Sequence, residues 1–321
     1  MKTQISGLGQ AIRNSESSIA MIQTTEGALN EVSKIIVGQD LVVQQVLTSI
    51  FCNGHCLLVG VPGLAKTLLV QTIASSLGLN FSRIQFTPDL MPSDIVGSEI
   101  LDERREFKFI KGPLFSNIIL ADEINRTPPK TQSALLESMQ ERSITNAGKR
   151  YVLEEPFFVL ATQNPIEQEG TYPLPEAQLD RFMFYVVLDY PTYEEELQIV
   201  KQTTVRSHTA LNTVMSADEI LKFQDVITRL PVTENVLQYA VSLVAKTRPS
   251  SEKAAEIVKE YIEWGAGPRA SQYMIMAAKC HAAINGKYSP DIEDVKAIAK
   301  PILMHRMVKN YKAEAESITI E

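Results

Sequence analysis

The sequence predicts an α/β protein in which a parallel β-sheet, covered by helices on both faces, precedes a small all-helical domain. Three observations predict this fold. Short apolar segments alternate with helical segments up to about residue 190, a glycine-rich turn joins one of these segments directly to a helix, and helix follows helix from Tyr193 onward. Such alternation is typical of parallel sheets, because each parallel connection must cross a face of the sheet.

The strands of the sheet are expected in the first part of the chain, residues 1–190. Before them, residues 1–35 have an amphipathic helical pattern and residues 41–51 have a second one. The strands themselves are expected at residues 55–59, 80–85, 118–121, 157–162 and 182–188. Pro191 closes this part, and we place the boundary between two domains there.

The second domain, residues 191–321, is expected to be helical. Its helices are predicted at residues 194–207, 216–229, 233–246, 271–284 and 292–308. Ser216, with Glu219 three residues later, fits a capping box at the start of one of them. Residues 313–321 are expected as a frayed tail or a short added strand.

A candidate phosphate-binding loop, Gly60-Val61-Pro62-Gly63-Leu64-Ala65-Lys66-Thr67, follows the apolar segment 56–59. In such a loop the backbone N–H groups and the helix N-terminus surround an anionic polyphosphate. Lys66 would reach the outer phosphates, and the Thr67 hydroxyl would face Mg²⁺. The loop therefore predicts binding of a nucleoside triphosphate, although Ala65 stands where the general pattern has glycine.

Two carboxylates end the apolar strand expected at residues 118–121. Strands of a parallel sheet deliver functional groups at their C-terminal ends, so we expect these side chains beside the phosphate loop. Asp122 would hold Mg²⁺ through its water shell, and Glu123 would polarise the water that attacks the γ-phosphate. A single strand end of this kind could also be a solvated surface turn, and the phosphate loop upstream favours the catalytic interpretation.

An uncharged amide follows a third expected strand, where residues 157–162 run into Gln163-Asn164-Pro165. Next to an acidic pair, an amide can orient the attacking water without adding charge. Asn164 is the candidate for this role. Because Asn-Pro alone is only a turn signal, this interpretation depends on the two other motifs.

The composition is that of an ordinary soluble globular protein, with 321 residues of which 45% are hydrophobic and 21% charged. The net charge, 31 − 38 = −7, argues against a body-wide attraction to nucleic acid or anionic membranes. The N-terminus lacks the apolar core of a signal peptide, and the longest apolar run, residues 182–188, is too short to span a bilayer. We therefore expect a cytoplasmic protein that does not insert into membranes.

The three cysteines, Cys52, Cys56 and Cys280, cannot all be paired within the chain and suit a reducing compartment. His55 lies between the first two, which raises the possibility of a metal site. The spacing lacks a second pair of ligands, so we expect no metal there.

Four ordered motifs make the chain resemble the AAA+ ATPases, and most closely the MoxR family. They are Gly60 to Thr67, Asp122-Glu123-Ile124-Asn125-Arg126-Thr127-Pro128-Pro129-Lys130, Ala161-Thr162-Gln163-Asn164-Pro165, and Leu174-Pro175-Glu176-Ala177-Gln178-Leu179-Asp180-Arg181-Phe182. The resemblance covers roughly residues 30–310, and Ala65 is a form that this family often uses. It implies an AAA+ three-layer αβα P-loop domain with a parallel sheet, a small all-helical lid domain, and ATP with Mg²⁺ as the cofactors.

The resemblance also implies roles for single residues. Asn164 matches the family's first sensor, and Arg181 is similar to the arginine finger that reaches the ATP of a neighbouring subunit. Arg269 is similar to the second sensor on the lid. Without the resemblance, Arg181 would be interpreted as an ordinary ion-pair partner and Arg269 as an arginine at the start of a helix that covers apolar surface. The nucleotide is expected to contact Val37, Gly38, Val61, Pro62, Gly63, Leu64, Ala65, Lys66, Thr67 and Leu68.

By the same resemblance the protein is expected to be a hexameric homo-oligomer that acts as a chaperone-like remodeller. A client enzyme and a partner with a von Willebrand factor A domain are implied. A metal-chelatase-like ATPase subunit and a helicase-like nucleic-acid motor are the alternatives, and the acidic balance counts against the second. A nucleotide-gated scaffold without hydrolysis is the least favoured function, because Glu123, Asn164 and Arg181 are all present.

Two β-hairpins are predicted inside the first domain. Residues 99–101 and 107–110 flank a charged turn at 102–106, as in the helix-two-insert group of AAA+ proteins, and residues 143–146 and 149–153 flank Ala147-Gly148. The candidate contacts at these tips are Arg104, Arg105, Lys149 and Arg150. A charged hairpin tip can also be simply solvated.

Overall fold

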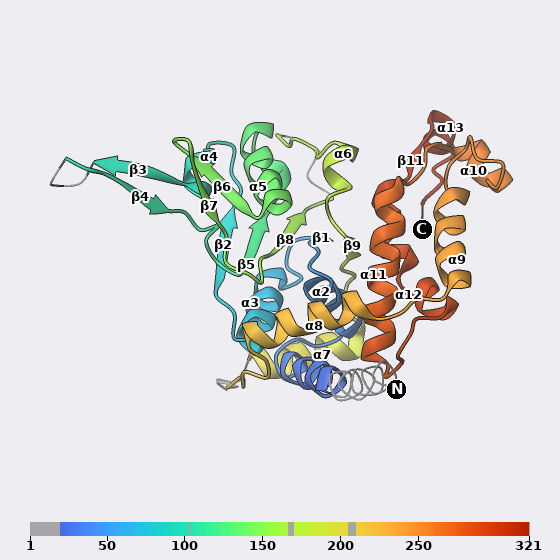
Figure 1. Ribbon diagram of the computed structural model, residues 1–321, viewed down its shortest axis with the longest axis horizontal. Coiled ribbons are helices and arrows are strands. Elements are labelled where there is room, and N and C mark those ends of the chain that lie inside the picture. Colours follow the sequence, from blue (N-terminus) through green and yellow to red (C-terminus); the bar gives the residue numbers. More distant parts are fainter. Residues whose placement is uncertain (1–19, 102, 104, 166–169, 205–209, 321) are drawn as a thin grey trace, which may run out of the picture.

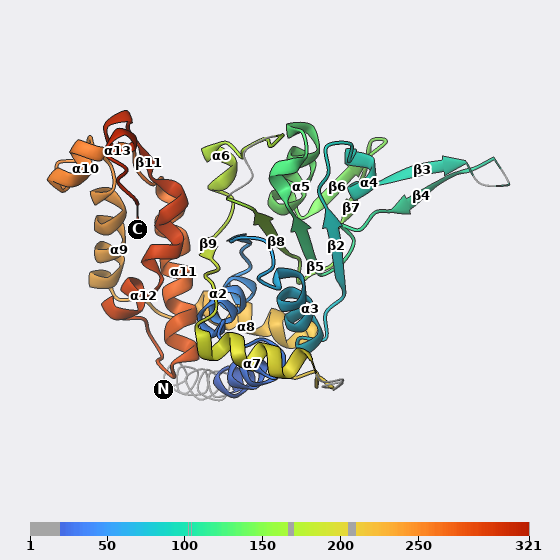
Figure 2. The ribbon, with the colours of Figure 1, turned by 180° about the vertical axis from the view of Figure 1, so that it is seen from behind.

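The structure, a computed structural model, describes residues 20–101, 103, 105–165, 170–204 and 210–320. Of the helical segment expected at residues 1–35, the described part forms a helix over residues 20–33, and residues 1–19 lie outside the described residues. Figures 1 and 2 show a larger body that holds the central sheet and, beside it, a smaller and mainly helical body.

The central sheet has five parallel strands in the order β2-β5-β8-β1-β9. The strands are Phe81–Gln85 (β2), Ile118–Asp122 (β5), Phe158–Gln163 (β8), Cys56–Val59 (β1) and Phe184–Val187 (β9). They coincide with the expected strands to within one or two residues, which confirms the predicted parallel sheet. Because β8 lies between β5 and β1, the C-terminal ends of these three strands meet at one edge.

Both faces of this sheet are buried, because alternate side chains of each strand pack into two different hydrophobic clusters. Leu58 and Leu120 belong to one cluster, which helices α2 (Asp40–Phe51) and α3 (Lys66–Ser76) cover. Leu57 and Ala121 belong to the other cluster, which helix α5 (Pro129–Glu141) covers. The larger body therefore has the three layers of an αβα domain, as predicted.

Two hairpins extend from the larger body, as the sequence predicts. The first, β3 (Gly97–Leu101) with β4 (Phe107–Lys111), follows the short helix α4 (Pro92–Val96) and forms the long arm in Figure 1. The second is β6 (Ser143–Asn146) with β7 (Lys149–Val152). Phe109 of the first stacks on Tyr151 of the second, with ring centroids 4.2 Å apart. This contact joins the two hairpins.

Of the four expected hairpin contacts, Arg105, Lys149 and Arg150 are exposed, and Arg104 lies outside the described residues. The Arg150 side chain donates to Ser143 Oγ, and the Lys149 ammonium lies 5.1 Å from the centre of the Tyr151 ring. No described contact assigns these charges a function.

The residues after Pro191 contribute no described strand to the central sheet. They form α7 (Tyr193–Thr203), α8 (Ala217–Arg229), α9 (Glu234–Lys246), α10 (Glu256–Tyr261), α11 (Pro268–Ile284), α12 (Ile292–Leu303) and α13 (Tyr311–Ala315). A two-stranded antiparallel sheet, β10 (Ile262–Trp264) with β11 (Val308–Lys309), joins these helices. The predicted helical lid is therefore present, with one short pair of strands added to it.

The lid differs from the sequence prediction in several places, including helix α10, which was not predicted, and the end of α7 at Thr203 rather than residue 207. Helix α11 starts at Pro268 rather than residue 271, since proline is well suited to the first turn of a helix. Helix α12 ends at Leu303 rather than residue 308, and the 3₁₀ helix Met304–Arg306 follows it directly. The expected tail at 313–321 begins within α13, which Asn310 caps by accepting from the Ala313 N–H.

No helix within the described ranges has both the length and the apolar character needed to cross a bilayer.

Candidate active site

The phosphate loop joins β1 to helix α3, in the order that the sequence predicts. Gly63 has φ +90°, and the site of a Cβ there faces open space, so its backbone can approach a ligand closely. Ala65 caps α3 with φ 52°, a left-handed conformation that explains why the general pattern has glycine at this position. Pro62, Gly63 and Ala65 are exposed. The loop thus presents the N-terminus of an 11-residue helix to solvent.

Lys66, the first residue of α3, lies close to the acidic pair. Its ammonium donates to the carbonyl oxygen of Gly60 at the start of the loop. Burial lowers the pKa of Lys66, while the charges of Asp122 and Glu123 act in the opposite direction. The structure therefore brings the lysine and both carboxylates together, as the sequence predicts.

Asp122 is the last residue of β5 and is held from both sides. Its Oδ1 accepts a hydrogen bond of 2.6 Å from Thr162 Oγ1 of the neighbouring strand β8. Its Oδ2 accepts from Arg83 Nε at 3.1 Å and Nη2 at 2.7 Å. The sequence motifs do not reveal Arg83, because only the order of the strands places β2 next to β5.

Glu123 follows β5 with φ 58°, an unusual conformation for a residue with a side chain, and one that is common at functional sites. Its N–H donates to Thr162 Oγ1 at 2.8 Å. Its Oε2 accepts from Gln85 Nε2 at 2.8 Å and from Arg126 Nε at 3.0 Å. The Glu123 carboxylate therefore faces Gln85, which is the last residue of β2.

Asn164 follows the end of β8 and is buried, with 5% of its surface exposed. Its neighbour Gln163 is in register with Val59 of β1, and the Gln163 carbonyl accepts from the Gly60 N–H at 3.4 Å. Asn164 thus stands between the phosphate loop and the acidic pair, where the sequence predicts it.

A pocket of about 370 Å³ lies beside the phosphate loop. Its lining is mostly apolar, as is usual for a site that binds a flat heteroaromatic base. Of the expected contacts it includes Val37, Pro62, Gly63, Leu64, Ala65 and Leu68. It also contains wall residues that the sequence analysis did not identify, namely Ile35, Ile36, Gln39, Leu69, Tyr190, Pro191, Glu196, Ile199 and Thr203.

The remaining expected contacts lie around this pocket rather than in its lining. Val61, Lys66 and Thr67 belong to the loop and to the first turn of α3. Gly38 lines an adjacent pocket; its φ of +75° favours glycine, and a Cβ there would lie 2.3 Å from the Glu195 carboxyl carbon, so a side chain would displace that carboxylate. Gly38 therefore brings its backbone against α7.

Arg181 and Arg269 do not lie at this site. The resemblance implies that Arg181 lies on the helix before the last strand, but Arg181 lies in a turn after helix α6 (Glu176–Leu179). Its N–H donates to the Gln178 carbonyl, an i−3 hydrogen bond that ends the helix. Its Nη1 donates to the Leu136 carbonyl of α5 at 2.7 Å. Arg269 Nη1 donates to Asp180 Oδ2 at 3.0 Å, so the two arginines lie close together.

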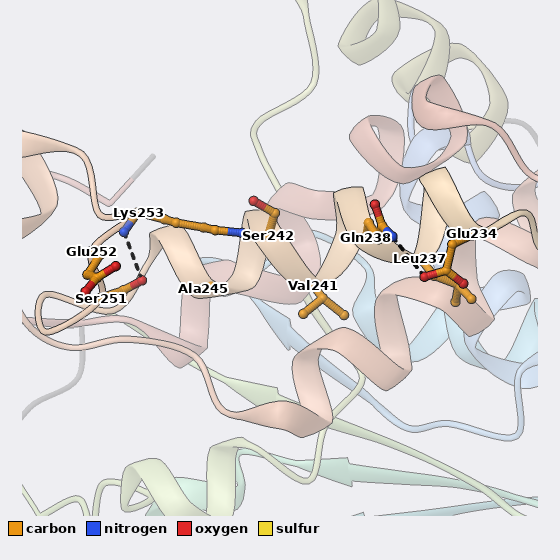
Figure 3. A pocket seen from close by; sticks show the side chains of 9 residues that line it. All are labelled: Glu234, Leu237, Gln238, Val241, Ser242, Ala245, Ser251, Glu252 and Lys253. Carbon is orange, nitrogen blue, oxygen red and sulfur yellow. Dashed lines mark hydrogen bonds between the residues drawn. The ribbon is translucent and has the colours of Figure 1, made fainter.

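A hollow of about 550 Å³ on the outer side of α9 is distinct from this site (Figure 3). Its polar contacts are local, such as Gln238 Nε2 donating to Glu234 Oε1 at 3.0 Å. It contains neither the phosphate loop nor the acidic pair, so we do not regard it as the active site.

The P-loop on a parallel sheet, the carboxylates beside it and the helical lid define the class of this protein, an AAA+ ATPase. Two family models agree: the ATPase family associated with various cellular activities matches residues 55–184, and the AAA lid domain matches residues 254–321.

Individual relatives define the family more closely. Chaperone MoxR1 of Mycobacterium tuberculosis is 44% identical over 95% of this chain and 81% of its own length. Protein MoxR of Paracoccus denitrificans is 27% identical over 90% of this chain and 88% of its own. A crystal structure from Cytophaga hutchinsonii, provisionally described as an ATPase, superposes with a TM-score of 0.90 at 43% identity, covering 97% of this chain and 94% of that one. The chain belongs to the MoxR family of AAA+ ATPases, which confirms the resemblance stated above.

Proposed function

We propose that copies of this chain form a ring in which each ATP is hydrolysed between two subunits, with Mg²⁺ as cofactor. One observation carries the proposal. The arginine expected to act on the γ-phosphate lies at the N-terminal ends of the strands, whereas the phosphate loop of the same chain lies at their C-terminal ends. Strands β1 and β9 are parallel, with Cys56 opposite Phe184 and Val59 opposite Val187. The phosphate loop follows β1, whereas Arg181 precedes β9.

The two groups are therefore separated by the length of the strands, roughly 10 Å for four residues. Figures 1 and 2 show α6 and α3 on opposite sides of the sheet. Arg181 can serve a phosphate only if that phosphate belongs to another subunit. The same holds for Arg269, which Asp180 holds beside Arg181.

The residues at the phosphate loop fit a magnesium nucleotide. Mg²⁺ prefers oxygen ligands and usually keeps several waters, and the Asp122 carboxylate and Thr67 hydroxyl are the oxygen donors near the loop. Among the described residues, no group of three or more His, Cys, Asp or Glu side chains could hold a metal alone. The phosphates would therefore complete the site, and the cation would neutralise their developing charge.

Each residue then has one task in hydrolysis. The loop N–H groups and Lys66 bind the β- and γ-phosphates, and Glu123 polarises the attacking water. Asn164 orients that water without adding charge. Arg181 and Arg269 of the adjacent subunit stabilise the charge on the transferred phosphoryl group, a contribution of about 10³ to 10⁵ in rate for arginine fingers of related enzymes.

We further propose that the ring remodels or matures client proteins, as the name of the relative MoxR1 suggests. The arm formed by β3 and β4 supports a protein client over nucleic acid. Residues 97–111 contain four acidic and four basic residues, so the arm has no net charge to attract a phosphate backbone. Its exposed side chains include Phe107, which is 75% exposed, and Leu101, which is 55% exposed. Exposed apolar groups of this kind are typical of protein contacts.

Two further parts of the proposal, a hexameric ring and a partner with a von Willebrand factor A domain, rest on the family resemblance. The cytoplasmic location rests on the composition and the three cysteines, and the domain boundary between residues 190 and 191 rests on the change of sequence pattern at Pro191. The test is a pull-down with the Glu123→Gln variant in ATP and Mg²⁺, which should retain the client in stalled complexes. Recovery of a folded protein client supports the remodelling function. Recovery of a chelatase core, or ATPase stimulation by DNA, would contradict it.

A further inference from the structure

The segment that carries the arginine finger, residues 180–183, is bound to the lid of its own chain. All four of its backbone carbonyls accept hydrogen bonds from lid side chains. The donors are Tyr273 of α11 and His305 and Arg306, which follow α12. This dense contact is unexpected for a short turn, since most loop carbonyls are satisfied by water or by local backbone.

Arg306 is the centre of this contact. Only 1% of its side chain is exposed, yet it carries a charge and so must be fully paired. Its Nε donates to Asp180 Oδ1 at 2.7 Å, and its Nη2 donates to the carbonyls of Asp180 at 3.0 Å and Phe182 at 2.6 Å. Its Nη1 donates to the Met183 carbonyl at 3.3 Å. The planar guanidinium thus fixes the backbone on both sides of Arg181.

Tyr273 and Asp180 complete the contact. The Tyr273 hydroxyl donates to the Arg181 carbonyl at 3.3 Å, and the Arg306 guanidinium lies 5.2 Å from the centre of the Tyr273 ring. Asp180 bridges two lid arginines, because its second oxygen accepts from Arg269. Both arginines proposed to reach the neighbouring ATP are therefore linked to the buried Arg306 of the lid, Arg181 through its backbone and Arg269 through Asp180.

The core also holds this segment, because the Phe182 and Met183 side chains are fully buried in its two hydrophobic clusters. The Met183 N–H donates to the His55 carbonyl at 2.7 Å, and the Arg181 side chain rests on the Leu136 carbonyl. That side-chain bond must break when Arg181 extends to another subunit, whereas the lid bonds to its backbone can remain.

We propose that Arg306 and Tyr273 are positioning residues that make the finger segment follow the lid. The inference deepens the proposed function and rests on it. The nucleotide pocket is lined by Ile199 and Thr203 of α7, the first helix after the core, so a nucleotide bound there contacts the connection to the lid. A shift of the lid in one subunit would then move Arg181 and Arg269 on the ATP held by the next subunit.

Tyr273→Phe and Arg306→Lys test the proposal, with Tyr288→Phe on the lid surface as the matched control. Tyr273→Phe removes one hydroxyl group. Arg306→Lys keeps the positive charge but replaces the planar guanidinium, with its several N–H donors, by a single ammonium group. We expect kcat to fall about fivefold for Tyr273→Phe and about tenfold or more for Arg306→Lys. The KM for ATP and the Kd of a non-hydrolysable ATP analogue should not change, and Tyr288→Phe should behave as the unaltered chain.

The same substitutions placed in an Arg181→Ala chain separate positioning from general structural damage. If both residues act through Arg181, they should lower the residual rate of that chain by less than about twofold. An equal loss in both backgrounds, or an unchanged kcat for folded Tyr273→Phe and Arg306→Lys proteins, overturns the inference. If Arg306→Lys does not fold, Tyr273→Phe still decides. Failure of the proposed function would differ, since Arg181→Ala alone would then retain full activity.

Discussion

Arg83 donates two hydrogen bonds to a single oxygen of Asp122, although the residues lie on different strands and are 39 positions apart. Asp122 Oδ2 therefore faces a cation at 2.7 Å on the side of β2, while Oδ1 faces Thr162 on the side of β8 and the phosphate loop. The guanidinium is about half exposed, with 46% of its side chain accessible, so it can swing away when another cation approaches.

Neutralising this competitor should favour the metal. We expect Arg83→Gln to lower the Mg²⁺ concentration for half-maximal ATP hydrolysis by about threefold to tenfold, since one unit charge near the site is worth about 1 kcal/mol at a partly exposed position. Arg229→Gln, which breaks an exposed ion pair with Asp225 on α8, is the control. A Mg²⁺ requirement that is unchanged or raised in Arg83→Gln would refute the competition.

Lys66→Ala should abolish measurable ATP binding. The substitution removes the only cation of the loop, and its ammonium is placed to reach the outer phosphates. Titration with a fluorescent ATP analogue measures the effect, and Lys296→Ala on the surface of α12 is the control. Binding within about threefold of the unaltered chain would show that the nucleotide lies elsewhere.

Glu123→Gln should bind ATP normally but lower kcat by about 10² to 10⁴, the usual contribution of a general base. The amide has the same shape and can still accept from Gln85 and Arg126, so the local structure should be kept while the negative charge is lost. Phosphate release measures kcat, and Glu141→Gln on α5 is the control. Retained turnover in this variant would remove Glu123 from the mechanism.

Acid should destabilise the protein before its carboxylates titrate. Burial lowers the pKa of His55 to about 3, and burial also lowers that of His305. Both pKa values lie below the usual value of 6.5 for histidine. As the pH falls below about 6.5, these two imidazoles therefore bind protons in the unfolded chain but not in the folded chain. The free energy of unfolding should fall by about 2 kcal/mol between pH 6.5 and pH 5 from His55 alone.

Denaturant unfolding at both pH values measures this loss. In a His55→Gln chain the decrease should be smaller, because one of the two buried imidazoles is absent. The neutral ring is defined by its bonds, since Nδ1 accepts from the Val159 N–H and Nε2 donates to the Met139 carbonyl. A free energy of unfolding that does not change between pH 6.5 and pH 5 would contradict the prediction.

The sequence predicted the parts of the fold that follow from local pattern. The five strands of the sheet are short apolar runs, and the phosphate loop and the acidic pair stand directly at their ends, so both the sheet and the residues around Lys66 and Glu123 could be placed. The hairpins were predicted for the same reason, because apolar runs flank their charged or Ala-Gly turns.

Contacts between segments far apart in the chain were not predictable in this way. Arg83 and Gln85 meet the acidic pair only because β2 lies next to β5, and no motif marks them. Tyr190 and Ile199 line the pocket because α7 folds back beside the loop. Likewise, nothing in the sequence pairs Asp180 with Arg269 and Arg306, since that contact depends on how the lid packs on the core.

The central claim is that the catalytic pocket is shared between subunits, and a mixing experiment tests it most directly. Arg181→Ala retains an intact phosphate loop and Glu123, whereas Glu123→Gln retains the finger, and each protein alone should be nearly inactive. When the two are mixed and allowed to exchange subunits, sites that combine an intact Glu123 with an intact Arg181 should form, and ATP hydrolysis should reappear. If mixed assemblies form and the mixture stays as inactive as its components, the pocket is not shared and the account is wrong.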